Sequence, residues 1–144
     1  LVMATDITLR LDKYQELAAT YGRGCEVISV PCPGLAGRIE RGDLAAADLR
    51  EMIRGYVGSF AGTVGSVVLG CTHYPFVRRQ IAEVLGGDVR FYDGGAGTAR
   101  QLGHRLGECG LLADEAHAGS VSFASSEDTP DELALYREFF EMEL

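Results

Sequence analysis

The sequence has no tryptophan, only four prolines, and no apolar run long enough to span a bilayer. Positive charge is also scarce: 13 basic residues face 21 acidic ones, which gives a formal net charge of −8. A field of that sign repels nucleic acid and anionic lipid, and the densest basic run, Arg78-Arg79, is too short to override it. We therefore expect neither a nucleic-acid partner nor a membrane.

Cysteine is scarce as well, and its spacing excludes the common zinc motifs. The four cysteines are Cys25, Cys32, Cys71 and Cys109. No pair has C-x-x-C spacing, so we expect no metal site. Nothing indicates secretion, and free thiols in a reducing, cytoplasmic setting are expected. Cys25, Cys32 and Cys109 are interpreted as packing residues.

The sequence does have the pattern of one globular α/β fold, with 47% hydrophobic residues in 144. Short apolar runs alternate with stretches of helical periodicity, which predicts a parallel sheet flanked by helices on both faces. We expect strands at 1–5, 25–30, 66–70, 89–92 and 120–124, and helices at 12–21, 34–41, 44–60, 74–85, 98–108 and 131–142. Asp43 is the expected N-cap of the third helix. Residues 1–5 resemble the second half of a buried strand, so we expect the chain to be part of a longer protein.

Reactive side chains are expected where parallel strands end, because ligands bind at that edge of such sheets. Cys71, Thr72 and His73 follow the strand at 66–70, and Thr5 and Thr8 follow the first strand. An imidazole beside a thiol can carry its proton, which favours nucleophilic or acid–base chemistry. The alternative for Cys71 is a small buried apolar residue at a strand end.

Several segments resemble bacterial glutamate racemases, and together they cover essentially the whole chain. The longest is V-L-G-C-T-H-Y-P-F at 68–76, which is similar to the family's second catalytic cysteine segment. Shorter ones are A-T-D-I-T at 4–8, P-C-P at 31–33 with I-E-R-G at 39–42, Y-D-G at 92–94 and V-S-F at 121–123. The resemblance implies a two-lobed fold in which residues 1–92 form the second lobe and 93–144 return toward the first.

The resemblance also implies an activity, namely cofactor-independent, two-base interconversion of L- and D-glutamate for peptidoglycan biosynthesis. Cys71 matches the catalytic thiol, His73 the histidine that assists it, and Glu40 an acidic residue on the same side; from the residues alone, Glu40 would be a solvated helix position. Thr72, Thr8 and Thr5 match substrate-binding positions. No cofactor or metal is implied.

The family's other cysteine, followed by an asparagine-threonine pair, is missing from this sequence, as is its aspartate beside a serine-glycine turn. We therefore expect a carboxyl-terminal part that is inactive alone and associates with the missing lobe or with a second copy. Apolar positions such as Leu135, Phe139 and Phe140 would be exposed without that lobe. Two alternatives stay open: a related amino-acid racemase or isomerase with another substrate, and a non-catalytic isolated lobe.

Overall fold

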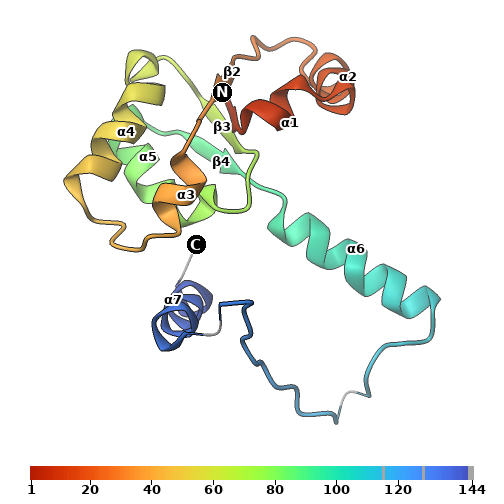
Figure 1. The fold of residues 1–144 in the computed structure, drawn as a ribbon. Coiled ribbons are helices and arrows are strands. Elements are labelled where there is room, and N and C mark those ends of the chain that lie inside the picture. Colours follow the sequence, from red (N-terminus) through yellow and green to blue (C-terminus); the bar gives the residue numbers. More distant parts are fainter. Residues whose placement is uncertain (115, 128, 143–144) are drawn as a thin grey trace. The chain divides into compact units, whose positions relative to one another are not determined.

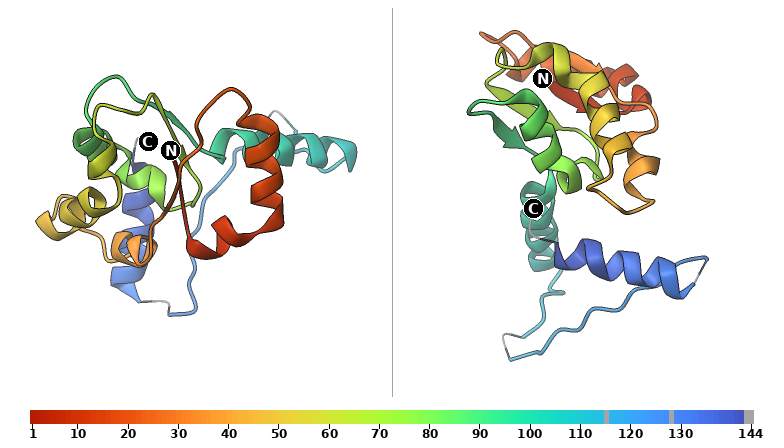
Figure 2. Two further views of the ribbon diagram at one scale, coloured as in Figure 1. Left: turned by 90° about the horizontal axis from the view of Figure 1, so that it is seen from above. Right: turned by 90° about the vertical axis from the view of Figure 1, so that its left-hand side faces the viewer.

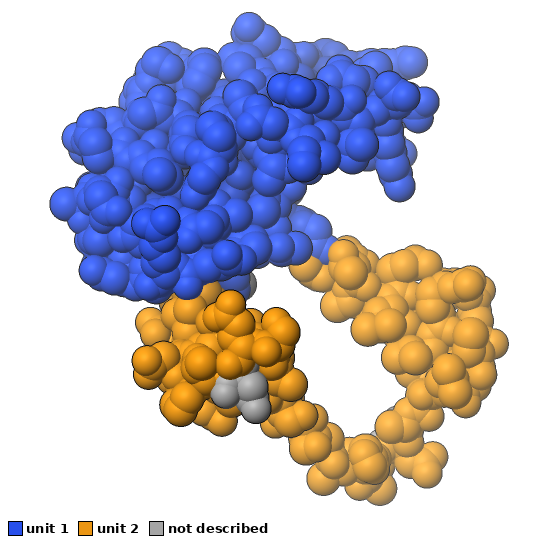
Figure 3. Space-filling model, in the orientation of Figure 1, with its two compact units in different colours: residues 1–94 blue, residues 95–144 orange. Residues whose placement is uncertain are grey.

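The computed structural model of the chain describes residues 1–114, 116–127 and 129–142. These residues form two compact units, Leu1–Gly94 and Gly95–Leu144, shown in different colours in Figure 3. Of the expected returning segment 93–144, positions 115, 128, 143 and 144 lie outside the described residues.

The first unit is built on a four-stranded parallel sheet with the strand order β2-β1-β3-β4 (Figure 1). The strands are β1 (Val2–Ala4), β2 (Ser29–Pro31), β3 (Ser66–Leu69) and β4 (Arg90–Tyr92). Every pairing between neighbours is parallel. The predicted α/β class with a parallel sheet is therefore confirmed.

Five helices and two 3-10 turns connect these strands. They are α1 (Asp6–Arg10), α2 (Asp12–Tyr21), α3 (Leu35–Ile39), α4 (Ala47–Val57), η1 (Gly58–Phe60), η2 (Tyr74–Val77) and α5 (Arg78–Leu85). The helix expected from 44 begins only at Ala47, and Asp43 is not its N-cap. Asp43 instead has a positive φ of 45°, a left-handed conformation that belongs to the turn before the helix.

One face of the sheet carries the hydrophobic core. Helices α3, α4 and α5 gather on this face, and α2 lies on the other side of the strands (Figure 2). The face and its helices supply the most deeply buried side chains: Met3, Leu35, Ile39, Leu49, Ile53, Val57, Val67, Tyr74, Val77, Ile81 and Leu85. Their spacing of three or four along α4 and α5 explains why these segments are helices with one apolar stripe.

The opposite face of the sheet is much less covered, although α2 lies on that side. Val2, Val68 and Tyr92 lie side by side there because their strands are in register. Val68 is 40% exposed and Tyr92 51% exposed. A cavity of about 800 Å³ separates this face from Tyr14 and Leu17 of α2. Parallel sheets normally bury both faces, and in the described part of this chain only one is filled.

The second unit contains α6 (Gly95–Glu108) and α7 (Pro130–Glu141), and the described residues between them form neither a helix nor a strand. The strand expected at 120–124 does not form. A lone extended segment leaves its backbone N–H and C=O groups unpaired, and the described part of this unit offers no strand beside which this segment could pair. Phe123 instead packs edge-on against Phe140 of α7, with ring centroids 5.6 Å apart. Phe140 nevertheless remains 63% exposed. In the described ranges, no helix is long and apolar enough to cross a membrane.

Candidate active site

Three neighbouring strands of the first unit end at the same edge of the sheet. β1, β2 and β3 are followed directly by Thr5, Cys32 and the pair Gly70-Cys71. Because β1 lies between β2 and β3, these residues come from adjacent positions at the carboxyl edge. This is the edge where parallel sheets bind ligands.

Gly70 allows the chain before Cys71 to approach β1 very closely. Its backbone N–H donates to the Met3 carbonyl at 2.7 Å. A Cβ at this position would lie 2.9 Å from the Met3 oxygen and 3.0 Å from the Ala4 Cβ. Only glycine fits without a backbone shift, so this contact determines where the following thiol lies.

Cys71, His73 and Glu40 form a connected chain of polar contacts. The Cys71 Sγ lies 3.6 Å from His73 Nδ1, and His73 Nε2 lies 2.8 Å from Glu40 Oε1. The carboxylate can only accept, so Nε2 carries the proton that is donated to it. When the ring carries no second proton, Nδ1 is the acceptor, and it is the atom nearest the Cys71 thiol. Glu40 thereby selects the histidine tautomer that can take a proton from Cys71.

The three side chains are open enough for a small molecule to reach them. Cys71 is half-buried, the His73 side chain is 28% exposed and that of Glu40 is 63% exposed. Thr72 Oγ1 lies 3.5 Å from His73 Nδ1, so the Thr72 hydroxyl and the Cys71 thiol are close to the same ring nitrogen. The thiol can therefore meet a substrate without any opening of the core.

Cys32 lies at the same edge but has a different environment. It is 2% exposed, and its Sγ donates to the Val30 carbonyl at 3.4 Å. Burial raises the pKa of the Cys32 thiol to about 12, so it stays protonated at neutral pH. This agrees with a packing role for Cys32. The same expectation is wrong for Cys25 and Cys109, which are both exposed.

Thr5 and Thr8 form a pair of their own at the end of β1. Thr5 is the N-cap of α1, where its Oγ1 accepts from the Thr8 backbone N–H at 3.3 Å, and the two hydroxyl oxygens are 2.9 Å apart. These hydrogen bonds account for the turn from strand to helix. In the described structure, the two threonines share the sheet edge with Cys71 but bond to each other rather than to the thiol or the histidine.

An ion pair that begins two residues before Glu40 was missed by sequence reasoning. Arg38 of α3 makes a two-point ion pair with Asp48 of α4, at 2.6 and 2.9 Å, and lowers the pKa of that carboxyl to about 2. The only sequence signal was a positive charge between Leu35 and Ile39, two buried positions of a short apolar helix. No group of three or more metal-binding side chains was found in the described ranges.

The fold and these side chains define a class: a parallel α/β lobe with a thiol, an imidazole and a carboxylate linked at the carboxyl edge of its sheet. No protein-family model matches the sequence. Curated relatives do match: a glutamate racemase of Pseudomonas putida is 44% identical over 128 residues, and one of Clostridium perfringens is 37% identical over 143. These matches cover 88% and 99% of this chain, respectively. The chain is a homologue of the glutamate racemases.

Solved structures agree with this relationship. The glutamate racemase from Francisella tularensis, in complex with D-glutamate, aligns over 99% of this chain with a TM-score of 0.72. The sequence identity of this pair is 24%, so the match shows a shared fold only. A glutamate racemase isoform from Bacillus anthracis aligns over 78% with a TM-score of 0.65 at 28% identity. The matches cover 54% and 43% of those chains. The chain also spans about half the length of the curated relatives, 48% and 55% for the two above.

Proposed function

We propose that this chain supplies one of the two acid–base sides of a glutamate racemase, with Cys71 as the group that exchanges the α-proton. The observation that carries the proposal is the contact chain from Cys71 through His73 to Glu40. The similarity to curated glutamate racemases supports glutamate as the substrate. Thr72, Thr8 and Thr5 are proposed to bind the substrate's polar groups.

The proposed step starts with a proton transfer within the protein. The Cys71 proton moves to His73 Nδ1, and the Glu40 carboxylate stabilises the imidazolium that results. The thiolate then takes the α-proton of glutamate, so that an S–H bond forms while the C–H bond breaks. The electron pair stays on the α-carbon, and a second acid on the opposite face returns a proton with inversion. No cofactor takes part in this scheme.

The second acid has to come from outside these three residues. Cys32 is buried and protonated, and Cys25 and Cys109 are exposed thiols for which no histidine contact is seen in the described residues. We propose that the half of the relatives that this chain does not match provides the second thiol. The isolated chain then does not racemise glutamate. The working assembly would act in the cytoplasm and supply D-glutamate for peptidoglycan.

A hybrid enzyme tests the proposal. This chain replaces the matching half of the Pseudomonas putida relative, and the hybrid is assayed with D- and L-glutamate in D₂O. We expect racemisation by the hybrid and none by the 144-residue chain alone. Cys71→Ser in the hybrid should stop racemisation but leave α-proton exchange on one enantiomer, because one base remains. Arg54→Met, which changes an exposed arginine of α4, is the matched control.

Three outcomes would contradict the proposal. Racemisation by the chain alone would show that both acid–base groups lie within it. A folded hybrid that exchanges the α-proton of another amino acid but not of glutamate would indicate a related racemase or isomerase. A folded hybrid that binds glutamate and exchanges neither enantiomer would leave only a non-catalytic lobe.

A further inference from the structure

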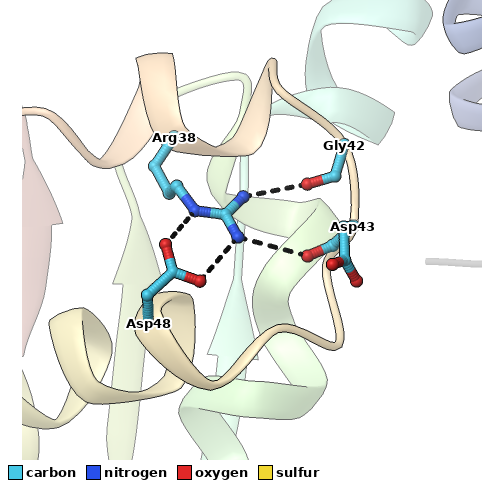
Figure 4. A network of polar contacts seen from close by, with 4 residues as sticks. All are labelled: Arg38, Gly42, Asp43 and Asp48. Carbon is cyan, nitrogen blue, oxygen red and sulfur yellow. Dashed lines mark hydrogen bonds and ion pairs between the residues drawn. The ribbon is translucent and has the colours of Figure 1, made fainter.

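Arg38 is the one buried charged side chain in the described structure, at 9% exposure. Its guanidinium makes four hydrogen bonds (Figure 4). Two go to the Asp48 carboxylate, at 2.6 and 2.9 Å, and two to the backbone carbonyls of Gly42 and Asp43, at 2.9 and 3.4 Å. A buried guanidinium is tolerated when its donors are paired in this way. Because those donors are occupied, Arg38 is not available to bind a substrate carboxylate.

The two carbonyls that Arg38 binds belong to an unusual turn. Gly42 has φ 71° and Asp43 has φ 45°, so two successive residues are left-handed, and one of them carries a side chain. Such a turn is costly unless the surrounding structure holds it. Arg38 holds it from α3, and Gln80 of α5 donates to the Leu44 carbonyl at 2.8 Å.

This turn follows directly on Glu40. Glu40 is the C-cap residue of α3, two positions after Arg38 and two before Gly42. Its side chain is 63% exposed, yet it meets His73 from 33 residues away at 2.8 Å. An exposed carboxylate has many rotamers, so the position of its backbone decides whether it reaches the ring.

We propose that Arg38 is a positioning residue of the candidate active site: by tying α3 and the 42–43 turn to Asp48, it keeps Glu40 within reach of His73. The inference rests on the proposed role of Glu40 and His73 in activating Cys71. The Arg38 guanidinium bonds to Asp48, Gly42 and Asp43 and does not touch the thiol. Its effect on the thiol passes through Glu40 alone.

The test measures the alkylation rate of Cys71 in the full 144-residue chain at pH 7 with iodoacetamide. Mass spectrometry of the peptides separates Cys71 from Cys109, an exposed thiol of the second unit that serves as the internal reference. We expect Glu40→Ala to lower the Cys71 rate about tenfold, the equivalent of one charged hydrogen bond. Arg38→Met should lower the Cys71 alkylation rate about threefold or more in the otherwise unaltered chain. In a chain that already carries Glu40→Ala, adding Arg38→Met should change the rate by less than about 1.5-fold.

Two further variants separate positioning from general stability. Asp48→Asn keeps the shape of an exposed side chain but weakens its two-point pair with Arg38. It should therefore also lower the Cys71 alkylation rate, and it provides the test if Arg38→Met does not fold. Arg54→Met removes an exposed ion pair with Glu51 on the same helix and should change nothing. The ¹⁵N shifts of the His73 ring should report the Nε2–H tautomer in the unaltered chain and a mixture after Glu40→Ala or Arg38→Met.

The outcomes are distinguishable. If Glu40→Ala and His73→Asn both leave the Cys71 rate unchanged, the proposed function fails and the inference fails with it. If Glu40→Ala slows Cys71 but folded Arg38→Met or Asp48→Asn variants do not, the inference alone is overturned. An equal effect of Arg38→Met with and without Glu40 also overturns it, because Arg38 would then act by another route.

Discussion

Replacement of Gly70 by alanine tests how closely the chain before Cys71 must approach β1. The new Cβ would lie 2.9 Å from the Met3 carbonyl oxygen, whereas ordinary contacts begin at 3.4 Å. The atoms it meets belong to the backbone and to the Ala4 Cβ, so no flexible side chain can move aside. The end of β3 therefore has to move away from β1, which also lengthens the 2.7 Å hydrogen bond from Gly70 to Met3.

The loss of stability in Gly70→Ala has two contributions, the overlap of the new Cβ and the lengthened hydrogen bond to Met3. Overpacking of a well-filled site costs about 1–3 kcal/mol, and a weakened backbone hydrogen bond adds about 1 kcal/mol. We expect Gly70→Ala to lower the free energy of unfolding of the first unit by about 2–4 kcal/mol. With a denaturant slope near 2 kcal/mol per M, the urea midpoint falls by about 1–2 M.

Pulse alkylation of Cys32 is the assay, because this thiol is 2% exposed and belongs to the first unit. Its labelling against urea reports when that unit opens. Gly55→Ala is the matched control: Gly55 lies inside α4, a Cβ there meets nothing within 4 Å, and alanine should raise stability by about 0.5–1 kcal/mol. An unchanged or higher midpoint for Gly70→Ala beside a stabilised Gly55→Ala would refute the close-approach argument.

The remaining predictions concern pH, the core and the second unit. The unfolded Cys32 thiol loses its proton near pH 9 and the folded thiol near pH 12, so the free energy of unfolding should fall as pH rises through this range; Cys32→Ala should flatten that fall in urea titrations followed by circular dichroism. Ile53→Ala, at a fully buried position, should cost about 2–5 kcal/mol in the same titrations, whereas Ile7→Ala, at a 76% exposed position, should stay within about 0.5 kcal/mol. Phe123→Ala removes the ring contact with Phe140 and should speed hydrogen exchange of the α7 amides; unchanged α7 exchange would contradict a role for that contact.

The sheet was predictable because its strands carry their own signals. The apolar run at 66–70 is bounded by glycines. The strand before Cys32 ends among prolines as expected, but it begins at Ser29 rather than at residue 25. Cys71 and His73 were also predictable as a pair, since they lie two residues apart at a strand end. Each of these signals is local, so neighbouring residues were sufficient to reveal it.

The features that sequence reasoning missed depend on distant partners. The segment at 120–124 has the composition of a strand, but in the described residues it has no neighbour to pair with. Glu40 meets His73 across 33 residues, and only the resemblance pointed to it. Arg38 had still less to distinguish it, because its acceptors are an aspartate ten residues away and two carbonyls of a turn with unusual φ values.

The two ends of the contact chain are held by different parts of the first unit. Gly70 fixes the thiol through β1, and Arg38 fixes the carboxylate through the start of α4. Because these anchors share no partner, the stability losses of Gly70→Ala and Arg38→Met should add within about 0.5 kcal/mol in the double variant. Their effects on Cys71 alkylation should not add, since a displaced thiol no longer benefits from a well-placed Glu40. Additive alkylation effects would show that Gly70 and Arg38 influence the thiol by separate routes, and the linear order from Cys71 through His73 to Glu40 would have to be given up.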